Sequence, residues 1–283
     1  MSFFNHLKSI EHSPVRWQVE AEVLTSLQAG YPLEELPCLM DPLVSEAKVP
    51  ETYVPLRTRI FRNEDSYPKS LEKMFDAPWS ISAEGTEILI NARSWLGVVG
   101  SRDPDSRSRQ WMDYHLAEIL RKTNCGIVSG GARGVDDLAH RISMQEKRQT
   151  LVVLPSGLDQ IYPSTWNREK QRCMDRGAVF ISEYADQQEM RKYLFSHRNR
   201  LIAALSTAVL IIQAAEKSGT LMTAHRALEL GKPVYVLPAH PLEKPFAGNL
   251  ELLKEGAQLV TNAQDLISFM SVDADSNFHM VDQ

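Results

Sequence analysis

The chain has 283 residues, and its 43% hydrophobic and 24% charged content is that of an ordinary globular protein rather than a disordered one. The formal net charge of -5 counts against general polyanion binding, because a non-specific nucleic-acid domain is usually basic over a whole face. Any site for a polyanion must therefore be a local pocket.

The two ends of the chain differ in character from its middle. Residues 1–88 carry scattered prolines and one good helical stretch at 15–27, so we predict a small, mostly helical N-terminal domain with a linker there. Residues 271–283 are acidic and too few to fold alone, and we predict that they form a short polar C-terminal tail.

The middle of the chain, residues 89–270, alternates short apolar runs with amphipathic segments. This βαβ pattern predicts an α/β domain with an extended Rossmann-like parallel sheet and helices on both faces. The predicted strands are 95–99, 126–129, 151–154, 179–181, 208–213, 234–237 and 258–260. The predicted helices are 107–121, 135–146, 164–176, 198–205, 221–230, 249–255 and 263–270.

The sequence gives no sign of a membrane, a metal or a cofactor. The longest uncharged apolar stretch, 201–215, is too short and too often interrupted by polar residues to span a bilayer, and the N-terminus lacks the pattern of a secretory signal. The three cysteines, Cys38, Cys125 and Cys173, are widely spaced and form no CxxC pair, which argues against a disulfide framework and a zinc site. We therefore expect a cytoplasmic protein.

Three glycine-containing turns each follow a predicted strand and precede a predicted helix. They contain Gly100, Ser101 and Arg102 in the first turn, Gly130, Gly131 and Arg133 in the second, and Lys217, Ser218, Gly219 and Thr220 in the third. Parallel strands end at one edge of a sheet, where helix N-termini offer free N–H groups to phosphate. We predict that these turns build an anion site, with Arg102 and Arg133 as phosphate contacts.

A dense basic cluster precedes the third turn. Lys192 and Phe195 lie in a predicted loop at 185–196, and the triplet Arg198, Asn199 and Arg200 opens the next predicted helix. A cation beside an aromatic ring suits single-stranded DNA, which is held by phosphate pairing and base stacking. We predict that all five residues contact DNA.

These turns, together with Tyr162-Pro163, Ser182-Glu183 and the basic triplet, occur in the order found in the DNA processing protein A family (DprA, also called Smf), which residues 95–266 resemble. The resemblance implies a protein without catalytic residues that binds and protects incoming single-stranded DNA. It also implies loading of the RecA recombinase in natural transformation and homologous recombination, and a homodimer.

Some motif residues have a plainer interpretation. Asp136 and His140 are predicted to be structural, the first as a helix cap or orienting group and the second as a packed side chain. Tyr162, which precedes a proline, is predicted to pack rather than to stack on a base.

Two other functions remain open from the sequence. A nucleoside monophosphate hydrolase of the lonely-guy type uses a similar glycine turn with a catalytic glutamate, but this chain has Thr223 at the matching position and leaves only carboxylates such as Glu183 for that role. A small-nucleotide sensor that reports through the N-terminal domain is the third interpretation. Hydrolysis of a mononucleotide, or binding of a mononucleotide without an oligonucleotide, distinguishes these functions from DNA binding.

Overall fold

The computed structural model of the chain describes residues 57–85, 90–92 and 94–276. The small helical domain predicted within residues 1–56 lies outside the described residues, as do residues 277–283 of the predicted tail. Within the described part of the chain, no helix is long and apolar enough to cross a membrane.

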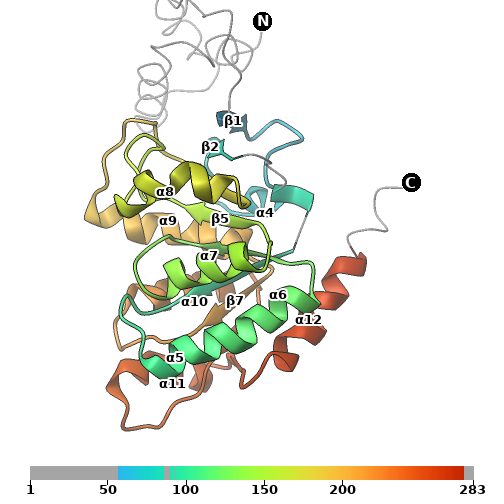
Figure 1. Cartoon of the computed structure of the whole chain (residues 1–283), viewed down its shortest axis with the longest axis vertical. Coiled ribbons are helices and arrows are strands. Elements are labelled where there is room, and N and C mark those ends of the chain that lie inside the picture. The colour runs from blue at the N-terminus through green and yellow to red at the C-terminus, as the bar shows by residue number, and fades with distance from the viewer. Residues whose placement is uncertain (1–56, 86–89, 93, 277–283) are drawn as a thin grey trace, which may run out of the picture.

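A nine-stranded sheet forms the centre of the described part, with the strand order β1-β2-β6-β5-β4-β3-β7-β8-β9. Figure 1 shows this sheet with helices packed around it. The strands are β1 Arg57–Phe61, β2 Ser80–Glu84, β3 Trp95–Val99, β4 Gly126–Ser129, β5 Thr150–Val153, β6 Ala178–Ser182, β7 Ala208–Ile211, β8 Val234–Val236 and β9 Gln258–Leu259. The seven strands from β6 to β9 in this order pair in parallel, and β1 and β2 add an antiparallel edge beside β6. The Rossmann-like parallel sheet predicted from the sequence is confirmed.

The strand order reverses between β3 and β7. The chain builds outward from β3 through β4, β5 and β6, and then returns to place β7 against the other side of β3, with Leu96 opposite Ala208. Such a reversal separates the loops that leave the carboxyl ends of the two strands, and ligands of open α/β sheets bind in the resulting crevice. The topology thus indicates where a site should lie before any side chain is considered.

Helices cover both faces of the sheet. They are α4 Lys69–Glu72, α5 Ser106–Trp111, α6 Ala117–Lys122, α7 Val135–Gln145, α8 Thr165–Met174, α9 Lys192–Leu205, α10 Gly219–Glu229, α11 Ala247–Lys254 and α12 Gln264–Ser276, with a π-helical turn at Met112–Leu116 and 3-10 turns at Ile90–Ala92 and Lys244–Phe246. Every helix predicted within residues 89–270 is present, and α9 begins six residues earlier than the sequence pattern predicted.

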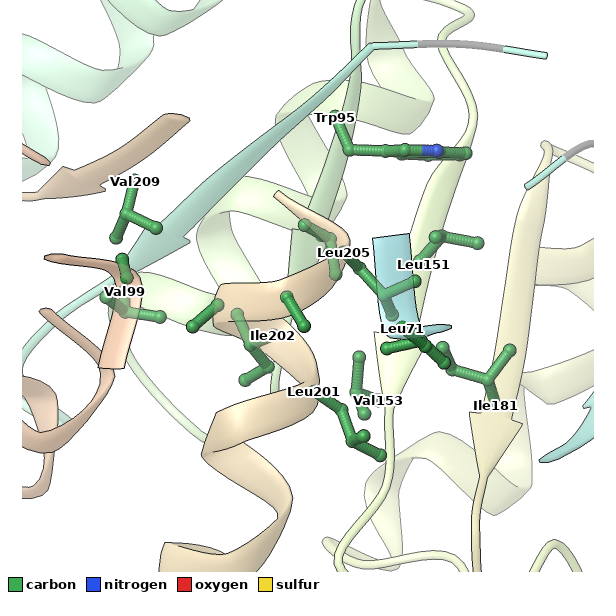
Figure 2. Packing of buried hydrophobic residues seen from close by; sticks show 14 of the residues in the cluster. Leu71, Trp95, Val99, Leu151, Val153, Ile181, Leu201, Ile202, Leu205 and Val209 are labelled. Carbon is green, nitrogen blue, oxygen red and sulfur yellow. The ribbon is translucent and has the colours of Figure 1, made fainter. Parts of the chain in front are cut away.

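Alternate residues of each strand supply two separate hydrophobic cores, as the pleat of a strand requires. On one face, α9 and α10 pack on side chains such as Val99, Leu151 and Val209 (Figure 2). On the other face, Leu96, Val98 and their neighbours pack under the α5–α6 segment, α7 and α12, and a third cluster lies under α8. These cores fix the helices whose ends line the candidate site.

The first two strands correct the predicted domain boundary at residue 88. Residues 57–84 belong to the main sheet, because β2 pairs with β6 and β1 pairs with β2. The sequence pattern did not reveal β2, since Ser80, Ser82 and Glu84 are buried polar residues. Arg59 of β1 donates hydrogen bonds to the hydroxyls of Ser80 and Ser82 at 2.9 and 2.7 Å, which satisfies these groups in the interior. At the other end, α12 continues through the predicted start of the polar tail to Ser276.

Gly134 lies where the loop after β3 contacts the start of α7, at the carboxyl edge of the sheet. Its φ of 95° is accessible to glycine but strained for other residues, and a Cβ there would lie 2.4 Å from the carbonyl oxygen of Ser101. The next residue, Val135, donates its N–H to that same carbonyl at 3.1 Å. The loop after β3 and the start of α7 are therefore in backbone contact.

We predict that Gly134→Ala lowers the free energy of unfolding by about 2–4 kcal/mol, because it adds both backbone strain and a steric clash. Urea unfolding followed by circular dichroism measures this change. The matched control is Gly219→Ala, since a Cβ at Gly219 meets nothing within 4 Å. Equal stability of the two variants would contradict the close contact at Gly134.

Candidate functional site

A pocket of about 830 Å³ lies at the carboxyl edge of the sheet where the strand order reverses. Its walls come from the loop after β3, the loop after β7, the first half of α9 and the start of α10. We call this hollow the switch-point pocket. Its position agrees with the crevice that the topology predicts.

Ten of the fifteen residues predicted to bind DNA line the switch-point pocket. They are Gly100, Ser101, Arg102, Lys192, Phe195, Arg198, Asn199, Ser218, Gly219 and Thr220. The other five, Gly130, Gly131, Arg133, Arg200 and Lys217, are not among its lining residues. The ten residues come from segments more than a hundred residues apart in the sequence, and the fold brings them to one pocket.

The start of α10 offers backbone donors to the pocket. Ser218 precedes the first helical residue, and its side chain makes no capping hydrogen bond to the helix. Gly219 and Thr220 begin the helix, and the space around Gly219 is open. The N–H groups and the positive end of the helix dipole at such a terminus favour an anion. Asn199 supports the turn by donating to the carbonyl of Gly219 at 3.2 Å.

Two guanidinium groups lie near one aromatic ring at the pocket. The guanidinium carbon of Arg102 is 5.3 Å from the centre of the Phe195 ring, and that of Arg198 is 6.0 Å from it. The ring of Tyr162 meets Phe195 edge to face, with 5.7 Å between their centres. Both Arg102 and Lys192 are exposed and can therefore reach a ligand. The arrangement combines mobile cations with a fixed aromatic surface.

Arg198 has a different place from the exposed cations, because it is only 2% exposed. Its Nη1 donates to the carbonyl of Gly130 at 2.7 Å and also to the carbonyl of Val153. These two carbonyls lie at the ends of β4 and β5, so the side chain ties α9 to the sheet. Burial lowers the pKa of Arg198 to about 10, an effect that the neighbouring Asp136 opposes. Arg198 stays protonated at neutral pH and forms a charged part of the pocket wall.

Asp136 is the counter-charge of this buried arginine. Burial raises the pKa of the Asp136 carboxyl to about 6, although Arg198 and hydrogen bonds from Ala132, Ser129 and Gly130 act in the opposite direction. The carboxyl follows the second glycine turn on the first turn of α7 and lines the pocket. Its contacts with the turn are those of the structural role that the sequence favours.

His140 is fully buried on the same helix. Its Nδ1 is 2.6 Å from the Thr150 hydroxyl, and its ring packs edge to face against Trp166. Burial, with a further contribution from Arg198, lowers the pKa of His140 to about 3, so the ring is neutral throughout the physiological range. These contacts agree with the packing role predicted for this residue.

The second glycine turn supports the pocket wall, to which it contributes Ala132. A Cβ at Gly130 would lie 2.5 Å from the guanidinium nitrogens of Arg198, so glycine allows that side chain to lie against the backbone. Gly131 has a φ of 67°, and its carbonyl accepts a hydrogen bond from the indole of Trp166 at 2.8 Å. Arg133 is exposed, and its Nε is 3.4 Å from the carbonyl of Arg102. Gly130 and Gly131 therefore pack within the protein, and the phosphate contact of Arg133 stays a prediction.

Arg200 is placed differently from the prediction. It is 8% exposed, it forms an ion pair with the buried Glu183, and its Nε is 3.6 Å from a carboxylate oxygen of Asp76. Both Arg198 and Arg200 were predicted to neutralise phosphates, but residues two apart on a helix point in widely different directions. Only Arg198 and Asn199 of the triplet line the switch-point pocket.

Sequence reasoning missed several residues of the pocket wall. Met190, Ser196 and Ile202 line it. Ser196 lies on α9 because this helix already begins at Lys192. Gln213 also lines it, and its Oε1 accepts hydrogen bonds from the Asp105 N–H at 2.9 Å and the Ser108 hydroxyl at 3.2 Å. The sequence places Gln213 at the end of the strand predicted at 208–213, and only the structure shows that it positions the start of α5.

The fold and the pocket define an α/β protein with a pocket lined by exposed cations at the reversal point of a parallel sheet. The model of the family called DNA recombination-mediator protein A matches residues 58–271. The chain belongs to this family, as the resemblance found in the sequence implies.

Relatives and solved structures agree with this assignment. The chain is 34% identical over 203 residues to DNA processing protein DprA of Bacillus subtilis, a match that covers 71% of this chain and 67% of that protein. It is 34% identical over 206 residues to protein Smf of Escherichia coli, with 72% of this chain and 54% of that protein covered.

Two solved structures are similar to most of the chain. DNA processing protein A of Streptococcus pneumoniae matches with a TM-score of 0.73 and 26% identity, covering 96% of this chain and 99% of that one. The Helicobacter pylori DNA processing protein A matches with a TM-score of 0.67 and 33% identity, covering 77% of this chain and 96% of that one.

We predict that Arg198→Ala lowers the free energy of unfolding at pH 7 by about 3–5 kcal/mol, because it leaves two carbonyls and the Asp136 carboxylate without their buried cation. Chemical denaturation measures the loss. Arg121→Ala, which removes an exposed arginine from α6, is the control and should stay within about 0.5 kcal/mol of the unmodified protein. A stable Arg198→Ala protein would show that this side chain does not hold the strand ends.

Proposed function

We propose that the switch-point pocket binds single-stranded DNA. The observation that carries the proposal is a locally cationic pocket, with two guanidinium groups near one aromatic ring, in a chain whose net charge is negative. Arg102, Lys192 and the start of α10 would hold phosphates, and Phe195 would contact a base. Exposed Lys217, next to the pocket wall, would add attraction at longer range.

Two comparisons support the proposal. The family is named for mediating DNA recombination, and the Helicobacter pylori protein is described as having a single-stranded DNA binding mode. That protein is 33% identical to this chain and matches 96% of its own length. We extend the ligand class from it to this chain because the pocket offers the chemistry that single-stranded DNA needs.

The wider role that we propose follows the family. The protein would act in the cytoplasm as a homodimer, protect incoming single-stranded DNA and load RecA onto it during natural transformation and homologous recombination. Modest affinity at each pocket would make self-association useful, since two linked sites on one strand bind more tightly than either alone.

We also propose that the pocket binds its ligand without hydrolysing it. Asp136 is the one carboxylate among the described residues of the pocket wall, and Arg198 and the neighbouring turn already engage it. Thr223 lines the pocket at the position where a related hydrolase has its glutamate. Glu183 is not a lining residue and pairs with Arg200 instead. These placements support a binding role over a nucleoside monophosphate hydrolase.

We predict that Arg102→Ala and Lys192→Ala each weaken binding of a labelled oligothymidylate by about tenfold, because each removes one phosphate contact from an exposed position. Each should also reduce the slope of log affinity against log salt by about 0.7. Fluorescence anisotropy at several salt concentrations measures both quantities.

Arg121→Ala is the matched control, because Arg121 is an exposed arginine near the opposite edge of the sheet, just before β4. An equal-length duplex should bind more weakly than the single strand. Unchanged affinity in both pocket variants would contradict the proposed site. Release of free base from a nucleoside monophosphate would support the hydrolase instead.

We predict that binding tightens as the pH falls from 7.5 to 5, because Asp136, with its pKa raised to about 6, takes up a proton and removes a negative charge from the pocket. The expected gain is on the order of 1 kcal/mol, or about fivefold. Anisotropy titrations across this range measure it. In Asp136→Asn the part of the pH dependence due to this carboxyl should disappear, and His140 contributes none because its pKa is about 3. Identical pH profiles of the two proteins would contradict the assignment.

A further inference from the structure

A second hollow, of about 550 Å³, lies next to the switch-point pocket between the outward sides of α9 and α10. We call it the α9–α10 groove. Tyr193 and His197 of α9 line it opposite Met222 and His225 of α10. The sequence analysis assigned no function to any of these four side chains.

The groove and the pocket meet on one helix. Ser196 and Asn199 line both hollows. Successive helical residues are about 100° apart, so Tyr193 and Phe195 point to opposite flanks of α9, and Ser196 and Asn199 fall on the ridge between them. A ligand that leaves the pocket across this ridge enters the groove.

The groove has exposed apolar surface and no spare charge. Tyr193 is 65% exposed and Met222 is 49% exposed, which leaves both free to contact a ligand. The cations are already paired: Arg226 contacts Asp76 at 2.5 Å and Glu229 at 3.0 Å. Arg200 pairs with Glu183 and lies near the same Asp76.

This combination suits a nucleobase better than a phosphate. An exposed phenol ring and a thioether provide stacking and dispersion contacts for a flat ring. The serine and asparagine side chains along the groove provide neutral hydrogen-bonding groups for base edges. The arginines of the groove are already paired with carboxylates, so they attract a phosphate only weakly.

We propose that the α9–α10 groove is a nucleobase subsite that receives bases of the same single strand after it leaves the switch-point pocket across Ser196 and Asn199. The inference rests on the proposed function of the pocket and names the path of the strand beyond it. Phosphates are held in the pocket, and stacking on Tyr193 extends the binding site along α9.

The test compares oligothymidylates of increasing length on the full chain by fluorescence anisotropy. The unmodified protein should gain affinity with length beyond the shortest oligonucleotide that fills the pocket. Tyr193→Ala should lose about fivefold or more on the long oligonucleotides and nothing on the shortest, because only the long strands reach the groove. Met222→Glu, which adds a negative charge at the groove, should show the same length-dependent loss.

Tyr114→Ala is the matched control, because Tyr114 is 71% exposed on the segment that covers the other face of the sheet. A direct readout is photocrosslinking of a long oligonucleotide that carries 5-iodouracil, with adducts mapped by mass spectrometry. Adducts at Tyr193 are expected with long strands and not with the shortest. Adducts confined to Phe195 and Tyr162 would overturn the proposal.

Two failures are distinguishable. In the first, both groove variants bind all lengths like the unmodified protein while Arg102→Ala still binds weakly. The pocket then keeps its function, and the groove is not a DNA subsite but a surface for another occupant such as a protein partner. An equal loss at every length in Tyr193→Ala would also overturn the subsite, since it indicates an effect on the pocket. If the unmodified protein binds no oligonucleotide, the proposed function and this inference fail together.

Discussion

The buried guanidinium of Arg198 is the interaction on which the rest of the site depends. It donates hydrogen bonds to the carbonyls at the ends of β4 and β5 and balances the negative charge of Asp136. It also packs beside the ring of Phe195. Gly130 must be glycine because the guanidinium lies where its Cβ would be. A buried cation held by carbonyl dipoles and one carboxylate is stable only while all of these partners stay in place. The pocket wall is therefore rigid and charged before any ligand arrives, and this lowers the cost of ordering the site on binding.

The cations near the site are of two kinds, those buried in the structure, such as Arg198, and those that can contact a ligand. Arg198 and Arg200 are both buried and engaged by groups of the protein, whereas Arg102 and Lys192 are exposed at the pocket. Electrostatic attraction from a buried cation is weakly screened, so Arg198 can contribute to the field at the pocket without a direct contact. This explains how a chain with a net charge of -5 can present one local site for a polyanion.

The sequence predicted the parallel sheet because its central strands are continuous apolar runs that periodicity reveals, and it predicted most of the pocket because the carboxyl ends of such strands must meet. It failed where a polar residue occupies a buried position. Ser80, Ser82 and Glu84 hide β2, and their pairing with Arg59 and other partners appears only in three dimensions. In α9 the buried stripe runs through Leu194, Arg198 and Leu201, and the arginine interrupts the apolar pattern that would have placed the start of the helix at Lys192.

The same helix shows why adjacency in sequence was a poor guide to shared function. Arg198, Asn199 and Arg200 look like one cationic motif, but a helix turns each residue about 100° from the last, so the three side chains face the sheet, the ridge and the groove. Arg200 then finds Glu183 and Asp76 on its own side, and its charge is balanced there. The rotation places Lys192 and Phe195 on the pocket flank of α9 and Tyr193 on its groove flank. The two flanks of one helix therefore line two adjacent hollows, and the linear motif alone does not show this.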